Sequence, residues 1–244
     1  TFREWAKRLR DMGARSIDGH VVGSAEAFDE QWIGPAWPEG NWAIDVCAEV
    51  SALTCSDNRI EFRWLPERKG KARYTLSPLF EYVQTLNSVR VDAAAGENWR
   101  RYERGPEGNL FDVRGFVPPK MEVSDFVPIH DPPAFFLKGL HAALHSEGVS
   151  VKGASMPLAL AAAPDVATSG SQLLFTHRSP ALRELADSIV KRDRMLAADL
   201  LFKALGREVG MGGSFDGGRR AVEAYLARAG LSGAGFIAMD GSGL

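Results

Sequence analysis

Two residues of this chain have the spacing of a nucleophile and its base. Ser188 and Lys191 fit the S-x-x-K pattern of acyl-enzyme hydrolases, in which a lysine lies one helical turn from a nucleophilic serine. Ser188 is expected near the C-terminal end of a helix, however, where the helix dipole disfavours developing negative charge. We therefore do not assign Ser188 as a nucleophile.

A second pattern of the same hydrolases, S-D-N, occurs at Ser56-Asp57-Asn58. A predicted strand (RIEFRWL) follows it directly, where these enzymes have a helix. Aspartate and asparagine are also common in turns, because their side chains hydrogen-bond to the nearby backbone. We interpret this triplet as a turn that leads into the strand.

The sequence predicts neither a metal site nor a cofactor. His141 and His145 lie four residues apart, as two zinc ligands on a helix can, but Ala142 stands where a zinc protease has its glutamate. Cys47 and Cys55 have no companion ligands at zinc spacing. We interpret these cysteines as two buried thiols, with a disulfide between them as the alternative.

Composition and charge narrow the class of protein. The 244 residues are 45% hydrophobic and 25% charged, as in ordinary globular proteins. The formal net charge of −2 gives no basic field for a nucleic acid, and no apolar run is long enough to cross a bilayer. The sequence does not begin with Met and opens inside a predicted helix, so we expect it to be part of a longer protein.

The stretch from Ser179 to Leu205 predicts two amphipathic helices joined by a short charged turn at residues 191–194. Ser179, followed by a proline, is the expected N-cap of the first helix, and Gly206 is expected to end the second. The glycine-rich segment that follows, Met211 to Ser214, lacks the lysine of a phosphate-binding P-loop. We interpret it as an entry loop to a further helix.

The remaining elements are predicted from short apolar runs between turn-forming groups. Phe28–Trp42 is a Trp- and Pro-rich loop, which we expect to pack over an adjacent sheet; a binding surface is the alternative. Ala154–Gly170 is expected to be a linker. Helices are expected at Phe2–Met12, Asp131–Leu144 and Phe215–Ala229, and strands at Ser16–Val22, Ile44–Val50, Arg59–Leu65, Ala72–Leu76, Val89–Ala93, Trp99–Arg104, Leu110–Phe116, Glu122–Val127, Val149–Lys152, Gln172–Thr176 (buried) and Gly235–Met239.

Segments spread over nearly the whole chain follow one another in the order of a known family. They include IDGHVVG, GPAWPEG, EVSALTCSDN, NLFDVRGFVP, HDPPAFFLKGLHAAL, THRSPALRELADSIVKRD, AADLLFKALG and MDGSGL. On these segments the chain resembles the D-alanyl-D-alanine carboxypeptidase/endopeptidase family of low-molecular-mass penicillin-binding proteins (class C, penicillin-binding protein 4-like). The resemblance implies an α+β fold: a β-rich inserted module, then part of a penicillin-recognising, serine β-lactamase-like α/β domain.

The same resemblance implies a domain organisation. Residues 1–153 would be the β-rich insertion module with its flanking helices, 154–170 a linker, and 171–244 the returning part of the transpeptidase-like domain. In the family, S-x-x-K precedes the insertion and K-T-G follows the returning part. Because residues 1–244 correspond to the insertion and the returning part, the nucleophile and K-T-G segments are expected to be absent from this chain. No K-T-G occurs in it.

The family's S-D-N triplet is followed by a helix with an Ala-acid pair, which Ala198-Asp199 resembles. This anchor places the triplet positions on Asp193, Arg194 and Met195, so no member of the motif is kept. A register one residue earlier would keep an aspartate at 193 but would lose the anchor. Arginine has no acceptor and a thioether no donor, so neither replaces the serine or the asparagine. We expect Asp193 to N-cap the following helix and assign no catalytic residue.

Two functions follow from the resemblance. The first is a periplasmic serine-type peptidase that acts on peptidoglycan stem peptides through an acyl-serine intermediate and binds β-lactams. The alternative is a catalytically inactive relative that serves as a peptidoglycan- or protein-binding scaffold. Under either hypothesis this segment alone is predicted to have no peptidase activity.

Overall fold

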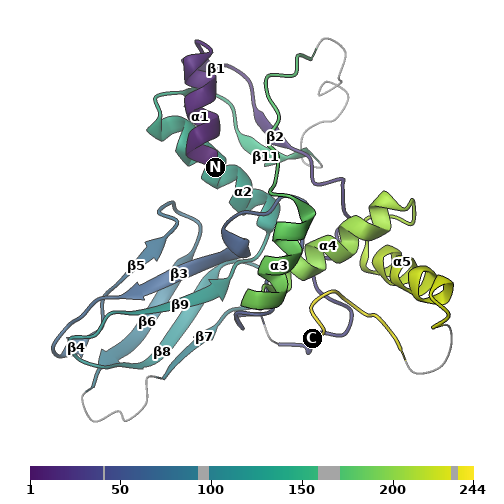
Figure 1. Ribbon diagram of the computed structural model, residues 1–244. Helices are drawn as coiled ribbons and strands as arrows, with labels where there is room; N and C mark the ends of the chain where they lie inside the picture. The colour runs from purple at the N-terminus through teal and green to yellow at the C-terminus, as the bar shows by residue number, and fades with distance from the viewer. Residues whose placement is uncertain (41, 93–98, 159–170, 232–235) are drawn as a thin grey trace.

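Strands β3 to β9 form two β-sheets at one end of the molecule (Figure 1). The structure is a computed structural model, and it describes residues 1–40, 42–92, 99–158, 171–231 and 236–244. One sheet, β5-β3-β9, is antiparallel; the other, β4-β6-β8-β7, contains the parallel pair β6 and β8. The bounds are β3 (Arg59–Trp64), β4 (Gly70–Lys71), β5 (Tyr74–Ser77), β6 (Gln84–Val91), β7 (Arg100–Glu103), β8 (Leu110–Val117) and β9 (Val123–Pro128).

The two sheets share one hydrophobic core. Residues along β3 and β8 alternate between a buried and a more exposed side, as the apolar alternation in their sequences predicts. Phe62 of β3 and Phe111 of β8 are fully buried, and their ring centroids lie 5.9 Å apart. The other buried members include Ile60, Trp64, Val89, Val113, Val117 and Val127.

Helices α1 (Phe2–Asp11) and α2 (Pro132–Ser146) pack against each other beside the sheets. Asp131, where the helix is expected to begin, caps α2, because its Oδ1 accepts a hydrogen bond from the Ala134 amide at 3.1 Å. Two short parallel pairs lie nearby: β1 (Ser16–Ile17) with β10 (Ser150–Val151), and β2 (Val21–Gly23) with β11 (Ser155–Pro157). These pairs tie the beginning of the chain to the residues that follow the sheets.

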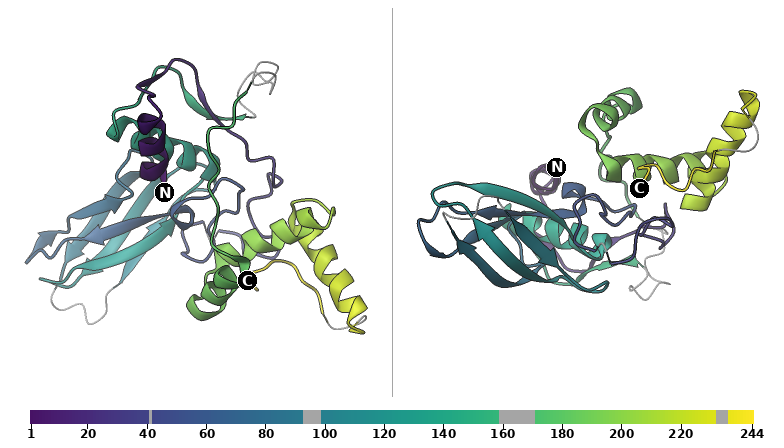
Figure 2. Two further views of the ribbon diagram at one scale, coloured as in Figure 1. Left: turned by 45° about the horizontal axis from the view of Figure 1, so that its top comes forward. Right: turned by 90° about the horizontal axis from the view of Figure 1, so that it is seen from below.

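Helices α3 (Leu182–Arg192), α4 (Met195–Glu208) and α5 (Phe215–Arg228) stand to one side of the sheets (Figure 2). The Trp- and Pro-rich loop packs against these helices and not over a sheet, as Trp37 lies in a buried cluster with Leu196 and Phe202. The expected Ile44–Val50 strand is wrong: this segment consists of turns and irregular backbone. Most of its apolar residues are buried because they join the same cluster, which also contains Cys47, Ala48, Val50 and Phe215, whereas Ile44 is 47% exposed.

Several other predicted details differ from the structure. Residues 172–176 form no strand, and Leu173 is 81% exposed, so the expected buried strand is wrong. The described part of the expected last strand, residues 236–239, likewise forms no strand. The expected linker begins with strand β11, and its residues 159–170 lie outside the described residues. The N-cap of α3 is Ala181, not Ser179.

Gly206 does not end α4, which continues to Glu208. A Cβ atom at this position would lie 2.5 Å from the carbonyl carbon of Gly217 and 2.6 Å from the carbonyl oxygen of Gly212. The glycine is therefore required for the close approach of α4 to the backbone that begins α5, and not for a helix stop. The overall architecture is α+β, as predicted.

Candidate functional site

The α3–α4 turn consists of Asp193 and Arg194. Asp193 has left-handed backbone angles (φ 52°, ψ 49°), and its amide donates to the carbonyl oxygen of Ile189. It is thus the C-cap of α3, and the expectation that it N-caps α4 is wrong. Arg194 is the N-cap residue of α4, and it makes no side-chain capping hydrogen bond. The turn therefore leaves the first amides of α4 without a side-chain cap.

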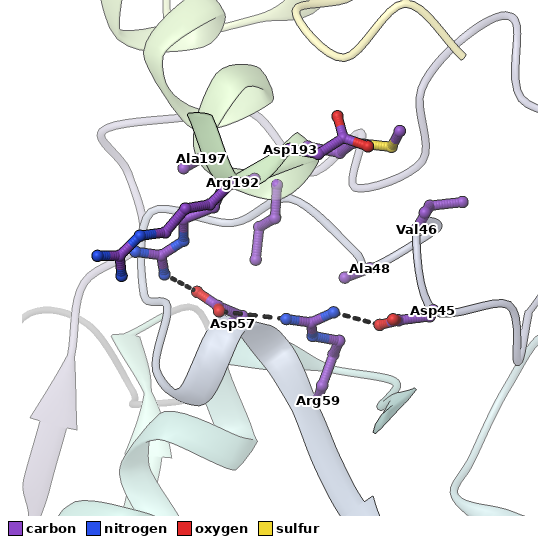
Figure 3. A pocket seen from close by; sticks show the side chains of 11 residues that line it. Asp45, Val46, Ala48, Asp57, Arg59, Arg192, Asp193 and Ala197 are labelled. Carbon is purple, nitrogen blue, oxygen red and sulfur yellow. Dashed lines mark hydrogen bonds and ion pairs between the residues drawn. The ribbon is translucent and has the colours of Figure 1, made fainter. Parts of the chain in front are cut away.

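A cavity of about 320 Å³ lies beside this turn (Figure 3). It lies between the α3–α4 turn and the segment that leads into β3, so residues far apart in the sequence share it. Its lining residues are Asp45, Val46, Ala48, Asp57, Arg59, Arg192, Asp193, Arg194, Met195, Leu196 and Ala197. The three predicted site positions, 193–195, are all among them.

Ion pairs cross the cavity. Nη2 of Arg194 lies 2.6 Å from Oδ1 of Asp57, and Nη2 of Arg59 lies 3.2 Å from Oδ2 of the same carboxylate. Arg59 also pairs with Asp45. These side chains are between 26% and 51% exposed, and exposed ion pairs of this kind contribute about 0–1 kcal/mol each. The pairs define where the side chains point more than they stabilise the fold.

Asp57 belongs to the Ser56–Asn58 turn, a 3₁₀ segment that leads directly into β3. The predicted turn is thus confirmed, but its place beside residues 193–195 was not predicted. All three residues have φ near +50°, a left-handed conformation that non-glycine residues rarely adopt. Asn58 is fully buried and holds this conformation: its Nδ2 donates to the Glu49 carbonyl oxygen at 2.8 Å, and its Oδ1 accepts from the Cys55 amide at 3.3 Å.

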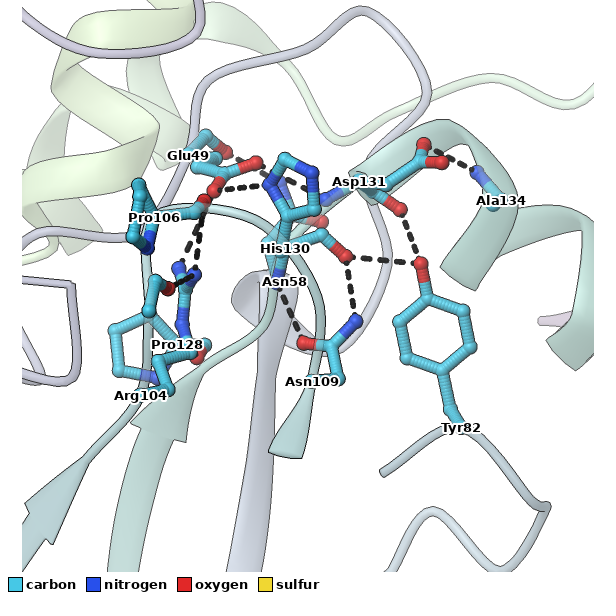
Figure 4. Close-up of polar contacts among 11 residues, drawn as sticks. Glu49, Asn58, Tyr82, Arg104, Pro106, Asn109, Pro128, His130, Asp131 and Ala134 are labelled. Atoms are coloured by element: carbon cyan, nitrogen blue, oxygen red, sulfur yellow. Dashed lines mark hydrogen bonds and ion pairs between the residues drawn. The ribbon is translucent and has the colours of Figure 1, made fainter. Parts of the chain in front are cut away.

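The carboxylate of Glu49 is the centre of a buried polar network at the base of the sheets (Figure 4). Its Oε1 lies 3.2 Å from Nη2 of Arg104 and 2.9 Å from Nδ1 of His130, and its Oε2 accepts from the Asp131 amide at 3.0 Å. Burial lowers the pKa of Arg104, an effect that the nearby Glu49 carboxylate opposes. This network fixes the segment to which Asn58, and through it the Asp57 turn, is attached.

A second buried polar cluster joins α4 to the C-terminal segment. Oδ1 of Asp199 accepts hydrogen bonds from the amides of Gly241 (2.8 Å) and Ser242 (3.0 Å). Burial is the main cause that raises the Asp199 pKa to about 6. One turn later, Nζ of the fully buried Lys203 donates to Asp29 at 2.7 Å. The predicted Ala-acid anchor is thus a structural attachment between AADLLFKALG and MDGSGL.

The other sequence candidates lie outside the cavity. Lys191 pairs with Asp187 at 2.8 Å, on the exposed surface of α3. His141 contacts Ser155 through its Nδ1 at 2.9 Å, and the described residues contain no metal-binding cluster of histidine, cysteine and acidic side chains. Ser214 caps α5 by accepting from the Gly217 amide at 2.9 Å, which supports the interpretation of its glycine-rich segment as an entry loop.

The two cysteines are free thiols; Cys47 is buried, as predicted, whereas Cys55 is only partly buried. Burial raises the pKa of both, that of Cys55 to about 12, so each remains protonated near neutral pH. The described residues that line the cavity include no serine, cysteine, lysine or histidine. The cavity can therefore bind charged groups, but its lining offers neither a hydroxyl or thiol nucleophile nor a nitrogen base.

Comparison with known proteins gives consistent matches over the whole chain. The model of the D-Ala-D-Ala carboxypeptidase 3 (S13) family matches residues 1–244. A D-alanyl-D-alanine carboxypeptidase from Actinomadura sp. is 28% identical over 248 residues, which cover 98% of this chain and 45% of the relative.

Two crystal structures of penicillin-binding protein 4 from Haemophilus influenzae have a similar fold. They match with TM-scores of 0.78 and 0.69 at 18% and 19% identity, the second being a complex with a β-lactam. Each match covers 99% of this chain, but 52% and 51% of the solved chains. The chain thus spans about half the length of the relatives that it matches.

Proposed function

Since the chain belongs to the D-Ala-D-Ala carboxypeptidase 3 (S13) family, we propose that the protein acts on the peptide stems of peptidoglycan as a serine-type carboxypeptidase. The observation that carries this proposal is the family match over every residue of the chain, from 1 to 244. The Actinomadura relative, a D-alanyl-D-alanine carboxypeptidase by name, supports it. Because the proposed substrate is part of the cell wall, we also propose that this protein acts in the periplasm.

The proposed reaction has two covalent steps. A serine hydroxyl attacks the carbonyl carbon of the penultimate D-alanine, the terminal D-alanine leaves as the free amine, and water then hydrolyses the acyl-serine ester. We assign the serine, its S-x-x-K lysine and the K-T-G segment to parts of the protein outside this sequence. Residues 1–153 are then the inserted module, 154–170 a linker and 171–244 the returning part of the penicillin-recognising domain.

In this assignment Asp193, Arg194 and Met195 occupy the positions of the family's S-D-N triplet. An arginine always carries its protons and accepts no hydrogen bond, so Arg194 cannot relay a proton to the leaving amine. Met195 offers a weak thioether acceptor in place of an amide. This segment therefore contributes the framework around the substrate rather than a catalytic group, and by itself it releases no D-alanine.

A second function, a non-catalytic peptidoglycan- or protein-binding scaffold, is favoured by one observation. Arg194 is bound to Asp57 across the cavity at 2.6 Å, so the altered turn is engaged with the rest of this chain. An ion pair of this kind gives the replaced triplet a structural role within the chain in place of a catalytic one.

Labelling of the full-length protein with a fluorescent penicillin separates the two functions. Covalent labelling that is lost when the serine of an upstream S-x-x-K is changed to alanine supports the peptidase. Absence of labelling in folded protein, shown by a cooperative thermal transition, contradicts it and supports the scaffold. Release of D-alanine by the isolated 244-residue chain would contradict the assignment of the nucleophile to another segment.

A further inference from the structure

Three arginines, Arg59, Arg192 and Arg194, line the cavity beside the α3–α4 turn (Figure 3). Two of them hold one carboxylate: Arg194 contacts Oδ1 of Asp57 at 2.6 Å and Arg59 contacts Oδ2 at 3.2 Å. Arginine is the side chain best suited to binding carboxylates, since its planar fork presents several donors at once. The arrangement has the geometry of a carboxylate site that is occupied by a side chain of the protein itself.

The beginning of α4 adds positive potential to the same cavity. This 14-residue helix has no side-chain cap, and its first three residues, Met195 to Ala197, all line the cavity. The first amides of a helix have no acceptors within it and carry the positive end of its dipole. The Met195 amide already donates to the Asp193 carbonyl oxygen at 3.1 Å, so an anion in the cavity would meet the amides of Leu196 and Ala197 in addition to the arginines.

The backbone holds Asp57 in this cavity at a cost in conformational free energy. Ser56, Asp57 and Asn58 are three successive non-glycine residues in the left-handed region. Asn58 is anchored by buried hydrogen bonds, whereas the partners of the Asp57 carboxylate among the described residues are the two arginines, and its side chain is 36% exposed. Strained residues of this kind are concentrated at ligand clamps and switches. The strained turn thus holds the Asp57 carboxylate against the arginines, and an incoming ligand can displace it from them.

We propose that this cavity binds the terminal carboxylate of a peptide, and that Asp57 competes for Arg59 and Arg194 as an internal substitute for it. The peptide class rests on the proposed function; the carboxylate chemistry rests on the cavity. A volume of about 320 Å³ is sufficient for the end of a peptide. Asp45 and Asp193 also line the cavity, so a singly charged carboxylate is favoured over a phosphate dianion.

Calorimetric titration of the protein with N-acetyl-D-alanyl-D-alanine, its C-terminal amide and inorganic phosphate tests the proposal. Asp57→Asn removes the charge that competes for Arg194, while Asp45 still pairs with Arg59. Asparagine tolerates the left-handed backbone, so this variant should bind the peptide acid about fivefold more tightly or better. Arg194→Met should bind it at least tenfold more weakly. Arg101→Met is the matched control, because Arg101 is exposed on β7 and pairs with Glu103 outside the cavity; its affinity should not change.

Opposite effects of the Asp57 and Arg194 variants support the proposal, because loss of a purely structural ion pair would change affinity in the same direction in both. Equal affinity for the peptide acid and its amide, tighter binding of phosphate, or absence of binding in both the wild type and Asp57→Asn would overturn it. Equal affinity for the L-alanyl peptide supports the carboxylate site while it counts against a D-Ala-D-Ala function. Penicillin labelling reports acylation and not this contact, so the two proposals can fail separately.

Discussion

At the scale of single residues, the buried side chain of Asp199 is only partly satisfied by hydrogen bonds. One oxygen accepts two backbone amides, while the other, Oδ2, is buried and has no hydrogen-bond partner among the described residues. Burial favours the neutral carboxyl group, which is why its pKa rises to about 6 from the ordinary 3.8. The charge of this group therefore couples the stability of the fold to pH.

We expect the free energy of unfolding to fall as pH rises from about 4 to about 6. In this range the folded state keeps the Asp199 proton and the unfolded chain has lost it, so the folded state binds more protons. A difference of about two pKa units corresponds to about 3 kcal/mol in the free energy of unfolding, most of which is lost by about pH 6. Asp199→Asn keeps one acceptor oxygen for the two amides but cannot ionise.

Urea denaturation of both proteins at several pH values between about 4 and about 7 measures this effect. The stability of Asp199→Asn relative to the wild type should improve with rising pH by up to about 3 kcal/mol. Parallel pH profiles would show that Asp199 keeps its ordinary pKa in the folded state.

Asn58 gives a second prediction at this scale, because it combines a strained backbone with buried hydrogen bonds. Asn58→Ala should lower the free energy of unfolding by about 2–4 kcal/mol, since it leaves the Glu49 carbonyl without this donor and retains the strain. Asn58→Gly loses the same bonds but relieves the strain, so it should cost about 1 kcal/mol less. Chemical denaturation compares the two; an alanine variant as stable as the glycine variant would argue against backbone strain.

At the scale of elements, the crossing of α4 and α5 depends on Gly206. Alanine normally stabilises a helix interior by about 1 kcal/mol relative to glycine. Here a methyl group would meet backbone atoms of residues 212 and 217, which cannot move aside without shifting α5. Gly206→Ala should therefore lower the free energy of unfolding by about 2 kcal/mol or more.

Gly139→Ala in α2 is the matched control for this helix crossing. A methyl group added there would lie nearest to the side chains of Phe2 and Phe80, at 3.0 and 3.3 Å, and these side chains can adjust. This variant should change stability by less than about 1 kcal/mol. Thermal unfolding of the two variants measures the contrast, and equal stabilities would show that α5 can shift at little cost.

The elements that the sequence predicted well are those whose partners are close or whose pattern is regular. The strands β3 and β8 follow the alternation of apolar residues, and α2 begins at the aspartate and prolines that predict its start. Ile44–Val50 has the composition of a strand, but its buried residues, Cys47, Ala48 and Val50, pack in a cluster with α4, about 150 positions later in the chain. Local pattern predicts burial and does not reveal what covers the segment.

The candidate site shows the same limit. Residues 193–195 were identified through the family anchor at Ala198-Asp199, and the Ser56–Asn58 turn was correctly predicted as a turn. Their meeting in one cavity was missed, because Asp57 and Arg194 are 137 positions apart and neither flanking pattern indicates the other. The complementary charges of the two residues were the available signal, but charged residues of both signs are too common in this sequence to pair without a structure.

At the scale of the whole molecule, the described part of residues 171–244 exposes many large apolar side chains. No described helix has the length and apolar character required to cross a membrane. The exposed residues are Leu173, Leu174, Leu182, Val190, Leu205, Val209, Tyr225, Leu231, Phe236, Ile237, Met239 and Leu244. Exposed apolar surface of this amount favours association.

We therefore expect the 244-residue chain to self-associate at micromolar concentration in sedimentation velocity. Leu173→Glu combined with Ile237→Glu should shift it toward the monomer, since both side chains are at least 74% exposed and lie on segments that form no helix or strand. Leu79→Glu, at an 89% exposed position beside the sheets, is the control and should leave association unchanged. A wild-type chain that stays monomeric would contradict the expectation.

The pairing of β1 with β10 and of β2 with β11 has a consequence for the order of events during synthesis. Ser16 lies beside Ser150 and Val21 beside Ser155. Strands β1 and β2 therefore cannot pair until more than 130 further residues have been synthesised. Strands β3 to β9 contain their own partners and can form earlier. Since distant contacts are slow to close, protection of amides in the two sheets should precede protection of Ser16–Gly23 in pulsed hydrogen exchange. The nascent N-terminus would then become resistant to proteases later than the two sheets, although it is synthesised before them.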